Sequence, residues 1–322
     1  MGARTRRVNR RSRSAGRNAG IALGLPLVFW LPASCHQGGT PAAAPPQAVE
    51  TVTDRAEVTS SARLVLRSTQ NDHEYEVRVG LPRSYGDTAR RFPIVYVLDG
   101  NALFGLATDL SRLLSLNPAF PETIVVGIAY PRAGRGAVLR RRLADFTPTN
   151  VPQEDTLHGA HTLPPGDRSG NAPVFTQVLL REILPLVERR FRADSTRRML
   201  WGYSLGGLFA LGVLLEHPGV FRSYLVSSPS LWWDRRWIFG REAELARRTG
   251  ELPARLFLSA GTLEQAADPW AEMATNLELL QKALAGRGYR GLEVSAALLA
   301  DETHLSVPAA SFSRGIRLLL AR

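Results

Sequence analysis

Two short segments of alternating apolar and polar residues open the regular part of the chain. Leu64 and Leu66 lie on one face of 62–68, and every second residue is apolar in 75–81. Alternation with a period of two predicts strands that bury one face. Asn71 and Asp72 lie between the two segments and favour a tight reversal, so the pattern predicts an antiparallel hairpin.

Farther along the chain the apolar runs become continuous, and segments with helical spacing separate them. Continuous apolar runs are typical of parallel strands that are buried on both faces. Strands that alternate with helices after an antiparallel start predict an α/β fold with a mostly parallel central sheet, an N-terminal hairpin and helices on both faces. The predicted strands are 93–98, 123–128, 198–201, 224–227, 255–260 and 292–299, and the predicted helices are 102–114, 176–191, 205–216, 269–285 and 306–320.

One long segment, residues 131–173, shows no sustained period and is rich in Arg, Pro, Gly and Thr. A stretch of this length without regular structure in a compact domain is usually a functional loop. We interpret it as a lid or loop insertion in the domain. A disordered surface insertion is the alternative that periodicity leaves open.

The N-terminus has the pattern of a targeting segment. Seven arginines precede the apolar run 21–31, which is too short to span a bilayer. Cys35 follows small residues and resembles a bacterial lipobox, although Pro32 stands where that motif usually has leucine. We expect 1–35 to be a signal peptide, with lipid anchoring at Cys35 or a simple secretory cleavage nearby as alternatives.

The rest of the chain forms one domain in this interpretation. Residues 36–50 predict a flexible linker of small residues, and 51–322 predict the folded domain. Cys35 is the only cysteine of the chain, so no internal disulfide can form. We expect an exported, monomeric protein that is held in the cell envelope or secreted.

The strongly basic charge does not indicate a nucleic-acid partner. The 322 residues carry a formal net charge of +11, and removing the seven N-terminal arginines leaves 11 − 7 = +4 for the remainder. That remainder is spread over isolated arginines, with Lys282 as the only lysine. Because no nucleic-acid-binding motif accompanies it, we expect no such partner.

A glycine-flanked serine carries the candidate chemistry. Residues 202–206 read Gly-Tyr-Ser-Leu-Gly and lie between a predicted strand and a predicted helix. In that context the pattern G-x-S-x-G forms a nucleophile elbow, a turn so tight that the serine backbone is strained and the flanking glycines are needed. The sequence therefore predicts Ser204 as a nucleophile, with the amide of Leu205 facing a developing oxyanion.

A serine hydroxyl needs a base, and the order of residues along the chain selects one. In the α/β-hydrolase arrangement the serine comes first, then the acid, then the histidine. Only His217 and His304 follow Ser204. His217 ends the predicted helix after the elbow, where a histidine commonly meets the helix dipole. His304 follows the last predicted strand in a short loop, so we predict His304 as the base.

The acidic residue should lie in the loop that follows the strand predicted at 255–260. Glu264 lies in the loop after that strand, and we choose it as the acid. Asp268 is the alternative, although an acid directly before proline is commonly a helix N-cap. Asp301 is too close in sequence to His304 to orient its ring.

A second oxyanion donor should come from the loop after the strand predicted at 93–98. Gly100 would let the backbone bend toward a substrate, so the amide of Asn101 is the candidate; a plain turn is the alternative. His158 and His161 form the only close histidine pair, without cysteines or a set of carboxylates beside them. We therefore expect no metal and no cofactor.

Five segments in this order and spacing form a specific pattern. They are 96–101 (Tyr-Val-Leu-Asp-Gly-Asn), 142–148 (Arg-Leu-Ala-Asp-Phe-Thr-Pro), 202–209 (Gly-Tyr-Ser-Leu-Gly-Gly-Leu-Phe), 228–233 (Ser-Pro-Ser-Leu-Trp-Trp) and 261–264 (Gly-Thr-Leu-Glu). Together they resemble the α/β-hydrolase esterases that include siderophore esterases of the enterobactin and salmochelin type, and the resemblance runs from about residue 68 to the C-terminus. It implies an α/β-hydrolase fold and hydrolysis of carboxylic esters by Ser204 and His304, and some relatives rely mainly on such a Ser–His pair.

The resemblance also implies two candidate substrate contacts. It suggests that Arg142 lies near the site and contacts an anionic or carbonyl group of the substrate; the alternative is a structural ion pair with Asp145. Trp232 and Trp233 are candidates for the floor of an aromatic acyl pocket, although paired tryptophans after a buried strand are more often core.

The sequence thus favours an exported serine esterase that acts on a small-molecule ester, such as a siderophore or another aryl or short-acyl ester. Acyl transfer to a sugar or alcohol, or peptide hydrolysis, would use the same triad and is the enzymatic alternative. A non-catalytic envelope lipoprotein that keeps the fold for binding is the second alternative.

Overall fold

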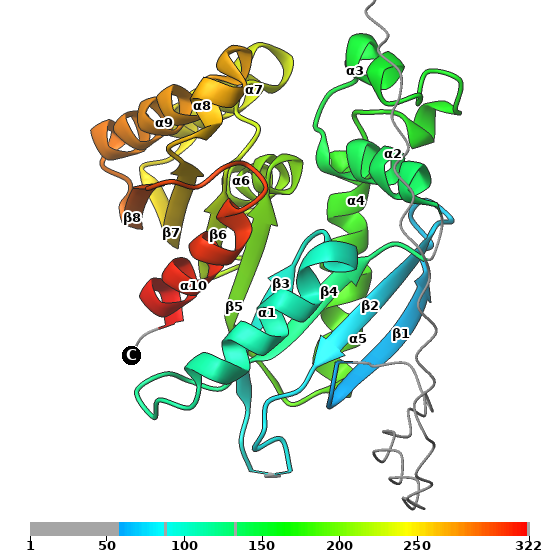
Figure 1. The fold of residues 1–322 in the computed structure, drawn as a ribbon, viewed down its shortest axis with the longest axis vertical. Helices are drawn as coiled ribbons and strands as arrows, with labels where there is room; N and C mark the ends of the chain where they lie inside the picture. Colours follow the sequence, from blue (N-terminus) through cyan, green and yellow to red (C-terminus); the bar gives the residue numbers. More distant parts are fainter. Residues whose placement is uncertain (1–57, 87–88, 132–133, 321–322) are drawn as a thin grey trace, which may run out of the picture. The chain divides into compact units, whose positions relative to one another are not determined.

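The computed structural model describes residues 58–86, 89–131 and 134–320, and in them eight strands form one sheet (Figure 1). The order of the strands across the sheet is β1-β2-β4-β3-β5-β6-β7-β8. β1 pairs antiparallel with β2 and β2 with β4, whereas every later neighbour is parallel. The predicted hairpin and the mostly parallel sheet are confirmed. The strands are β1 Ser61–Arg67, β2 Glu74–Gly80, β3 Phe92–Val97, β4 Ile124–Ala129, β5 Ala193–Tyr203, β6 Ser223–Ser227, β7 Glu251–Gly261 and β8 Arg290–Leu299.

Helices cover both faces of the sheet, and the central strands show why. On β3, Ile94 and Tyr96 point into one apolar cluster with α6 and α9, and Val95 and Val97 point into another with α1 and α10. Both sets are fully buried, so a continuous apolar run was needed. The helices are α1 Gly100–Leu114, α2 Arg135–Phe146, α3 Pro152–Leu157, α4 Ala172–Gln177, α5 Leu184–Arg190, α6 Leu205–Glu216, α7 Trp233–Arg248, α8 Glu264–Ala267, α9 Met273–Arg287 and α10 Val307–Leu320.

The segment 131–173 differs from the prediction because most of it is ordered. It contains α2, α3 and a 3-10 turn at Pro165–Asp167. The buried carboxylate of Asp155 accepts hydrogen bonds from Asn150 Nδ2 at 2.7 Å and from the Ser169 amide at 2.8 Å. Such polar contacts leave no mark on hydrophobic periodicity. The segment packs as part of the domain, which does not fit a disordered insertion, and its interpretation as a lid stays a prediction.

Three helices of the structure differ from the prediction, and each difference is local. The helix expected at 176–191 is interrupted by a π-helix at Val178–Ile183, next to Pro185, which lacks an amide donor. The helix expected at 269–285 breaks at Glu272, whose φ is 45°. α7 was not predicted, and its first turn is irregular, since residues 234–236 have left-handed backbone angles.

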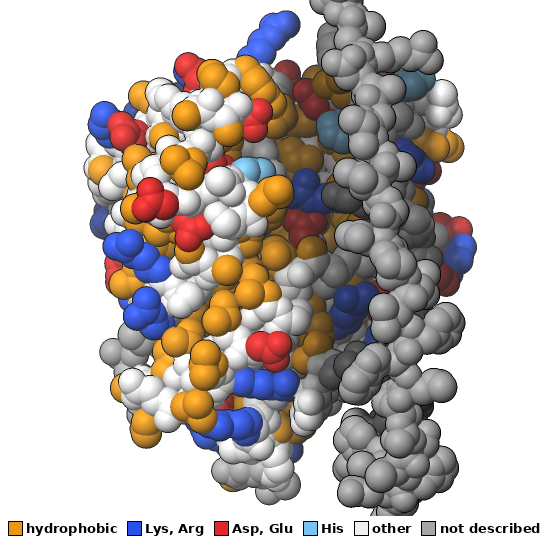
Figure 2. Space-filling model, viewed as in Figure 1, with side chains coloured by type: hydrophobic (Ala, Val, Ile, Leu, Met, Phe, Trp, Pro, Cys, Tyr) orange, Lys and Arg blue, Asp and Glu red, His pale blue; other side chains and the backbone are white. Residues whose placement is uncertain are grey.

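The predicted signal peptide, the linker and Cys35 lie outside the described residues. Every described residue falls within one unit, Arg55–Arg322. In the described part of the chain, no helix combines the length and apolarity that a membrane span requires. On the face shown in Figure 2, Lys and Arg side chains are scattered among Asp and Glu side chains.

The turn from β5 into α6 depends on a close backbone approach. A Cβ on Gly202 would overlap the carbonyl group of Gly206. Gly212, two turns later in α6, faces open space instead. A side chain at position 202 would therefore clash with the elbow, whereas a side chain at position 212 would not.

We expect Gly202→Ala to lower the free energy of unfolding by more than about 2 kcal/mol, because the elbow must open to admit the methyl group. Gly212→Ala should raise it by about 0.5–1 kcal/mol through helix propensity. Urea unfolding followed by circular dichroism measures both. Equal effects of the two substitutions would contradict the packing described for the elbow.

Candidate active site

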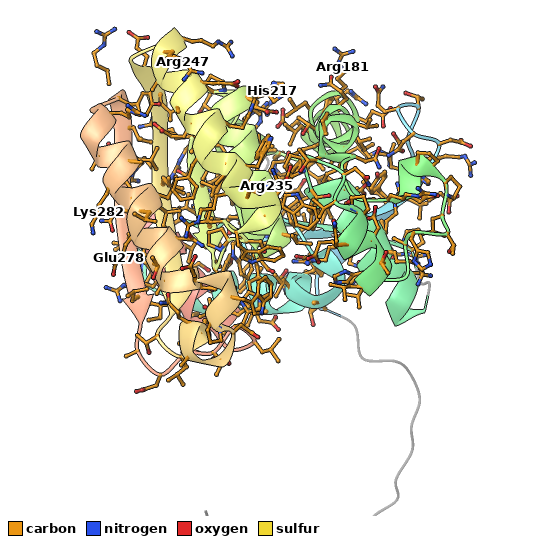
Figure 3. The ribbon with its side chains drawn as sticks, turned by 90° about the horizontal axis from the view of Figure 1, so that it is seen from above. Arg181, His217, Arg235, Arg247, Glu278 and Lys282 are labelled. Carbon is orange, nitrogen blue, oxygen red and sulfur yellow. The ribbon has the colours of Figure 1, made fainter. Side chains whose placement is uncertain are left out.

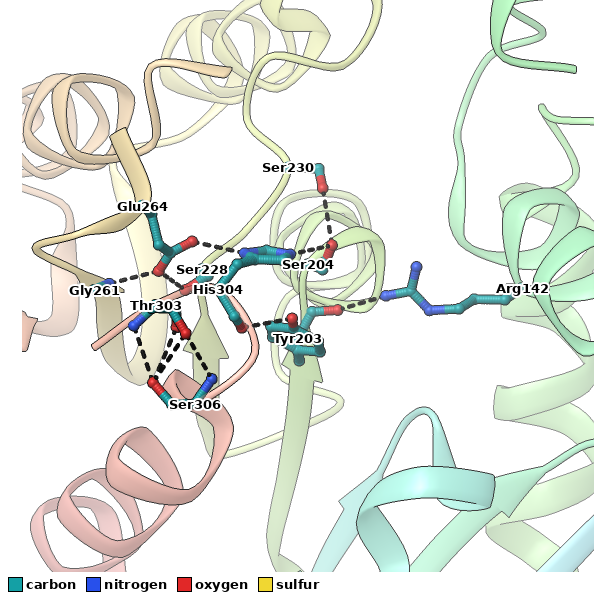
Figure 4. Close-up of polar contacts among 10 residues, drawn as sticks. All are labelled: Arg142, Tyr203, Ser204, Ser228, Ser230, Gly261, Glu264, Thr303, His304 and Ser306. Atoms are coloured by element: carbon teal, nitrogen blue, oxygen red, sulfur yellow. Dashed lines mark hydrogen bonds and ion pairs between the residues drawn. The ribbon is translucent and has the colours of Figure 1, made fainter. Parts of the chain in front are cut away.

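The loops that carry the candidate residues meet at one edge of the sheet. Parallel strands share the direction of their carboxyl ends, so the segments after β3, β5, β6, β7 and β8 emerge together. The register fixes their level, since Tyr203 lies opposite Ser227 and Ser227 opposite Ser259. Figure 4 shows the side chains that converge there.

Ser204 has the strained backbone that the elbow predicts. Its φ and ψ are 59° and −120°, a region that non-glycine residues rarely occupy. The Ser204 amide donates to the carbonyl group of Ser227 at 3.0 Å, and its own carbonyl group accepts from the Leu208 amide at 3.1 Å. These bonds hold the turn while the hydroxyl group projects from the sheet edge.

The structure brings Ser204, His304 and Glu264 together in one chain of contacts. Ser204 Oγ lies 3.2 Å from His304 Nε2, and His304 Nδ1 lies 2.6 Å from Glu264 Oε2 (Figure 4). Asp268, the alternative acid, is exposed and makes no side-chain cap of the following turn. His217 ends α6, three turns away from Ser204. The arrangement can pass a proton from the serine to the imidazole.

Glu264 is almost fully buried, and its second oxygen is also satisfied. Glu264 Oε1 accepts from Ser228 Oγ and from the Gly261 amide, both at 2.5 Å. Burial alone would raise the pKa of Glu264, but the hydrogen bonds from His304, Ser228 and Gly261 outweigh it and lower the pKa. Glu264 therefore stays ionised and can orient the imidazole.

His304 is held from two sides. Tyr203 OH donates to the His304 carbonyl group at 2.6 Å, and the two rings lie 4.9 Å apart. Thr303 and Ser306 exchange amide–hydroxyl bonds of 2.9 and 3.3 Å across the start of α10, in the manner of a capping box. The short loop is thus fixed with its imidazole over the strand ends.

The two predicted oxyanion donors begin helices beside each other. Leu205 is the first residue of α6 and Asn101 the second of α1, where amides have no acceptor inside the helix. A Cβ on Gly206 would lie 3.3 Å from Asp99 Oδ2, which shows how closely the two helix starts approach. The Asn101 side chain exchanges two 2.8 Å bonds with the backbone of Tyr130.

Arg142 lies at the site, but not in the ion pair expected for a structural role. Its Nε donates to Asp99 Oδ1 at 2.6 Å, and one Nη donates to the Tyr203 carbonyl group at 3.0 Å (Figure 4). Asp145 instead meets Arg141 at 3.7 Å and accepts from Tyr75 OH at 3.0 Å. The pairing with Asp145 is therefore wrong, because α2 turns Arg142 toward the end of β3.

A pocket of about 170 Å³ opens beside the serine and the histidine. Trp232 and Trp270 line it with their rings edge to face, 4.8 Å apart at 70°. Trp233 is core instead: it is buried and donates to Thr149 Oγ1 at 3.0 Å. The full lining is Ser204, Ser230, Trp232, Glu264, Asp268, Trp270, Ala271, Met273 and His304.

Sequence reasoning missed four residues of this site, namely Tyr203, Ser228, Ser230 and Trp270. Tyr203 ends β5, and Ser228 and Ser230 follow β6. All three lie inside segments that carried the family resemblance, but no pattern in those segments marked these side chains. Trp270 follows a proline at a helix start, and no pattern marked it either.

Metal binding has no cluster to support it in the described residues. There, no group of three or more His, Cys, Asp or Glu side chains is arranged to hold an ion. His158 ends α3 and contacts the Glu154 carbonyl group at 2.9 Å, and His161 is exposed.

Comparisons with known proteins find similarity over most of this chain. A family model described as "Putative esterase" matches residues 68–291. Ferri-bacillibactin esterase BesA of Bacillus subtilis is 29% identical over 262 residues, which are 80% of this chain and 88% of that protein.

Solved structures show the same fold. Siderophore hydrolase EstB of Aspergillus nidulans has a TM-score of 0.72 and 27% identity, over 84% of this chain and 98% of its own. An IroE-like serine hydrolase of Shewanella oneidensis has a TM-score of 0.68 and 26% identity, over 81% of this chain and 80% of its own. Together with the sheet order, these likenesses confirm the predicted α/β-hydrolase fold.

The lowered pKa of Glu264 predicts how its contribution to stability depends on pH. The contribution is present above the pKa of an unfolded glutamate, about 4.3, and is lost as pH falls through the lower folded value. We expect Glu264→Gln to destabilise the protein by about 1–3 kcal/mol at pH 7 and by less at pH 4. Urea unfolding at both pH values measures the difference.

Glu278→Gln is the matched control. Glu278 lies on the outer side of α9, 3.9 Å from Lys282, and both side chains are more than half exposed (Figure 3). Its substitution should change stability by less than about 0.5 kcal/mol. A pH-independent effect of Glu264→Gln would contradict the assignment of a lowered pKa.

Proposed function

We propose that Ser204 performs ester hydrolysis through an acyl-enzyme. The premise is that this chain belongs to the esterase family whose model matches residues 68–291, and that it is an ester hydrolase. The observation that carries the proposal is the continuous contact from Ser204 through His304 to Glu264, at 3.2 and 2.6 Å. No cofactor is needed for this chemistry.

In the first half-reaction His304 Nε2 takes the proton of Ser204 Oγ as the oxygen attacks the ester carbonyl carbon. Glu264 accepts from His304 Nδ1 and so keeps the lone pair of Nε2 toward the serine. The same ion pair stabilises the imidazolium that forms. His304 then gives the proton to the leaving alcohol as the carbon–oxygen bond breaks.

In the second half-reaction water takes the place of the alcohol. His304 removes a proton from the water, the hydroxide attacks the acyl carbon, and the proton returns to Ser204 as the acid leaves. The amides of Leu205 and Asn101 hold the oxyanion in both steps. A donor of this kind is typically worth about 10² to 10³ in kcat.

The pocket beside Ser204 supports an ester with an aromatic ring near the scissile bond. Trp232 and Trp270 present ring edges and faces on which an aryl group packs well. Arg142 is not part of the lining of this pocket, and it bonds Asp99 and Tyr203 through its Nε and one Nη. A contact of its other Nη with a carbonyl or anionic group of the substrate is proposed from the family resemblance. The named relatives are described as a ferri-bacillibactin esterase and a siderophore hydrolase, which supports a siderophore ester as one candidate substrate.

Export is a further part of the proposal and rests on sequence alone. A basic segment, a short apolar run and Cys35 after small residues support a signal peptide at 1–35 with lipid attachment at Cys35. The esterase domain would then act in the cell envelope or outside the cell.

We expect Ser204→Ala and His304→Ala each to lower kcat for p-nitrophenyl butyrate by about 10³ or more, because each removes the nucleophile or its base. His217→Ala, at the far end of α6 (Figure 3), is the matched histidine control and should keep full activity. Initial rates and labelling by a fluorophosphonate probe measure the effect. Equal rates of Ser204→Ala and the unchanged protein would end the proposal.

We expect Trp270→Ala to lower kcat/KM about tenfold for an aryl ester, chiefly through KM, because about 1.4 kcal/mol of ring packing is lost. Benzoyl and acetyl esters of one alcohol, and benzyl and ethyl esters of one acid, separate the acyl from the alcohol side. The alkyl members of each pair should change less than about twofold.

Leu305→Ala removes an exposed apolar side chain next to His304 that does not line the pocket, and it serves as the control. If both variants lose the same activity on every ester, the tryptophan pair does not select aryl groups.

A further inference from the structure

A three-residue turn after β6, Ser228-Pro229-Ser230, contacts both ends of the candidate triad (Figure 4). Ser228 and Ser230 are buried, and their side chains point to opposite partners. The register of the sheet sets the turn level with the elbow, since the Ser228 amide donates to the Ser259 carbonyl group at 2.7 Å. The Ser230 amide donates to the Ser204 carbonyl group at 3.1 Å.

The first serine of the turn faces the acid. Ser228 Oγ donates to Glu264 Oε1 at 2.5 Å, and the Gly261 amide donates to the same oxygen. Two donors on Oε1 fix the rotation of the carboxylate, and this rotation directs Oε2 toward His304 Nδ1. The acid therefore meets the imidazole in one orientation.

The backbone conformation of Ser228 is one that glycine adopts more easily than serine, so the serine is expected to have another role there. Its φ of 42° is in the left-handed region, where glycine has no steric cost and serine does. A glycine would fit this turn more easily, but it could not bond the carboxylate. What the chain gains from serine at this strained position is the hydrogen bond to Glu264.

The last serine of the turn faces the nucleophile. Ser204 Oγ has a single proton, which points to His304 Nε2 when the imidazole acts as the base. In the 3.4 Å contact between Ser230 Oγ and Ser204 Oγ, Ser230 is then the donor. This contact restricts the rotation of the Ser204 side chain and keeps its hydroxyl group in the attacking orientation.

We propose that the turn 228–230 is a positioning device in which Ser228 orients the carboxylate of Glu264 and Ser230 orients the hydroxyl group of Ser204. The proposal rests on the function proposed above, since it concerns the same triad. Neither serine accepts or delivers a proton in the reaction. Both act through the residue that they hold.

Loss of the Ser228 hydroxyl should alter the pH dependence of the reaction. One of the donors that lower the pKa of Glu264 disappears, so this pKa rises. The other titratable groups that face Glu264 are His304, from the loop after β8, and Tyr203, from β5; Asp268, after α8, lines the same pocket. They are unchanged in the variant. A carboxylate with one donor fewer is more basic and holds the protonated, inactive imidazole more tightly, so activity should fall off at a higher pH on the acidic side.

The experiment compares Ser228→Ala with Ser228→Gly in the full chain. Both remove the hydroxyl group, but glycine also relieves the left-handed strain and so protects against misfolding. We expect each to lower kcat about tenfold or more with little change in KM, and to move the acidic limb of the kcat/KM profile upward by about half a pH unit. Retained activity in Ser228→Gly would overturn the role of the hydroxyl group.

A double-substitution cycle tests whether Ser228 acts through Glu264. In the Glu264→Gln background, Ser228→Ala should cost less than about twofold in kcat/KM, because the carboxylate that it orients is absent. An equal loss in both backgrounds would show a merely structural role and would overturn the proposal.

Ser259→Ala is the matched control. Ser259 is a buried serine on β7 whose hydroxyl group contacts Ser311 Oγ at 2.6 Å, away from the triad. Its loss should leave the acidic limb in place. A shift of the limb in this control as large as in Ser228→Ala would contradict the proposal.

Ser230→Ala separates the two halves of the device. It should slow labelling of Ser204 by a fluorophosphonate about threefold or more without moving the acidic limb, because Ser230 does not touch Glu264. Labelling at the unchanged rate would remove Ser230 from the proposal.

Stability distinguishes failure of this proposal from failure of the proposed function. Ser228→Ala should reduce the difference in unfolding free energy between pH 7 and pH 4 even if Ser204 proves not to be the nucleophile. An unchanged pH dependence of stability would overturn the bond to Glu264 alone, whereas full activity of Ser204→Ala would overturn the esterase mechanism alone.

Discussion

The site depends on one buried carboxylate, that of Glu264. A charged group out of water is costly unless donors surround it, and here the donors come from the ends of three strands. Ser228 follows β6, Gly261 ends β7 and His304 follows β8. Because all three must be in place together, satisfying the carboxylate also fixes the relative positions of these loops. The imidazole that results from this arrangement has one nitrogen committed to Glu264 and the other directed at Ser204.

The sheet and the meeting of Ser204, Glu264 and His304 could be predicted because topology constrains them. Continuous apolar runs at regular intervals predict parallel strands, and parallel strands place every following loop at one edge. Ser204, Glu264 and His304 could therefore be chosen by their order along the chain. Ser228 could not, since its partner is 36 residues away and a lone serine after a strand has no distinguishing pattern. Sequence order selects which loops meet but not which small polar side chains touch.

The partners of the two arginines Arg141 and Arg142 on α2 could not be predicted for a different reason. Asp145 is three residues after Arg142 and four after Arg141, and a helix brings both arginines near it. Which one turns away depends on where the helix packs, and Arg142 turns toward Asp99, 43 residues earlier. The arginine-rich helix itself has a weak apolar stripe, so 131–173 gave no period although the structure orders most of it. Its order depends on buried polar residues such as Asp155.

Left-handed backbone angles recur where the strands reach the site. Asp99, Ser204, Ser228 and Asp301 have positive φ, and they follow β3, β5, β6 and β8 within two residues of the strand end. Each such residue costs about 1–3 kcal/mol and persists only when its surroundings hold it. At each of these ends the chain must reverse sharply to keep its side chains above the sheet edge. The end of β7 is instead crowded at Gly261, where a Cβ would overlap the carbonyl group of Glu302. The crowding and the hydrogen bonds at these strand ends hold Ser204, His304 and Glu264 in contact without a substrate, which is the preorganisation that a functional site requires.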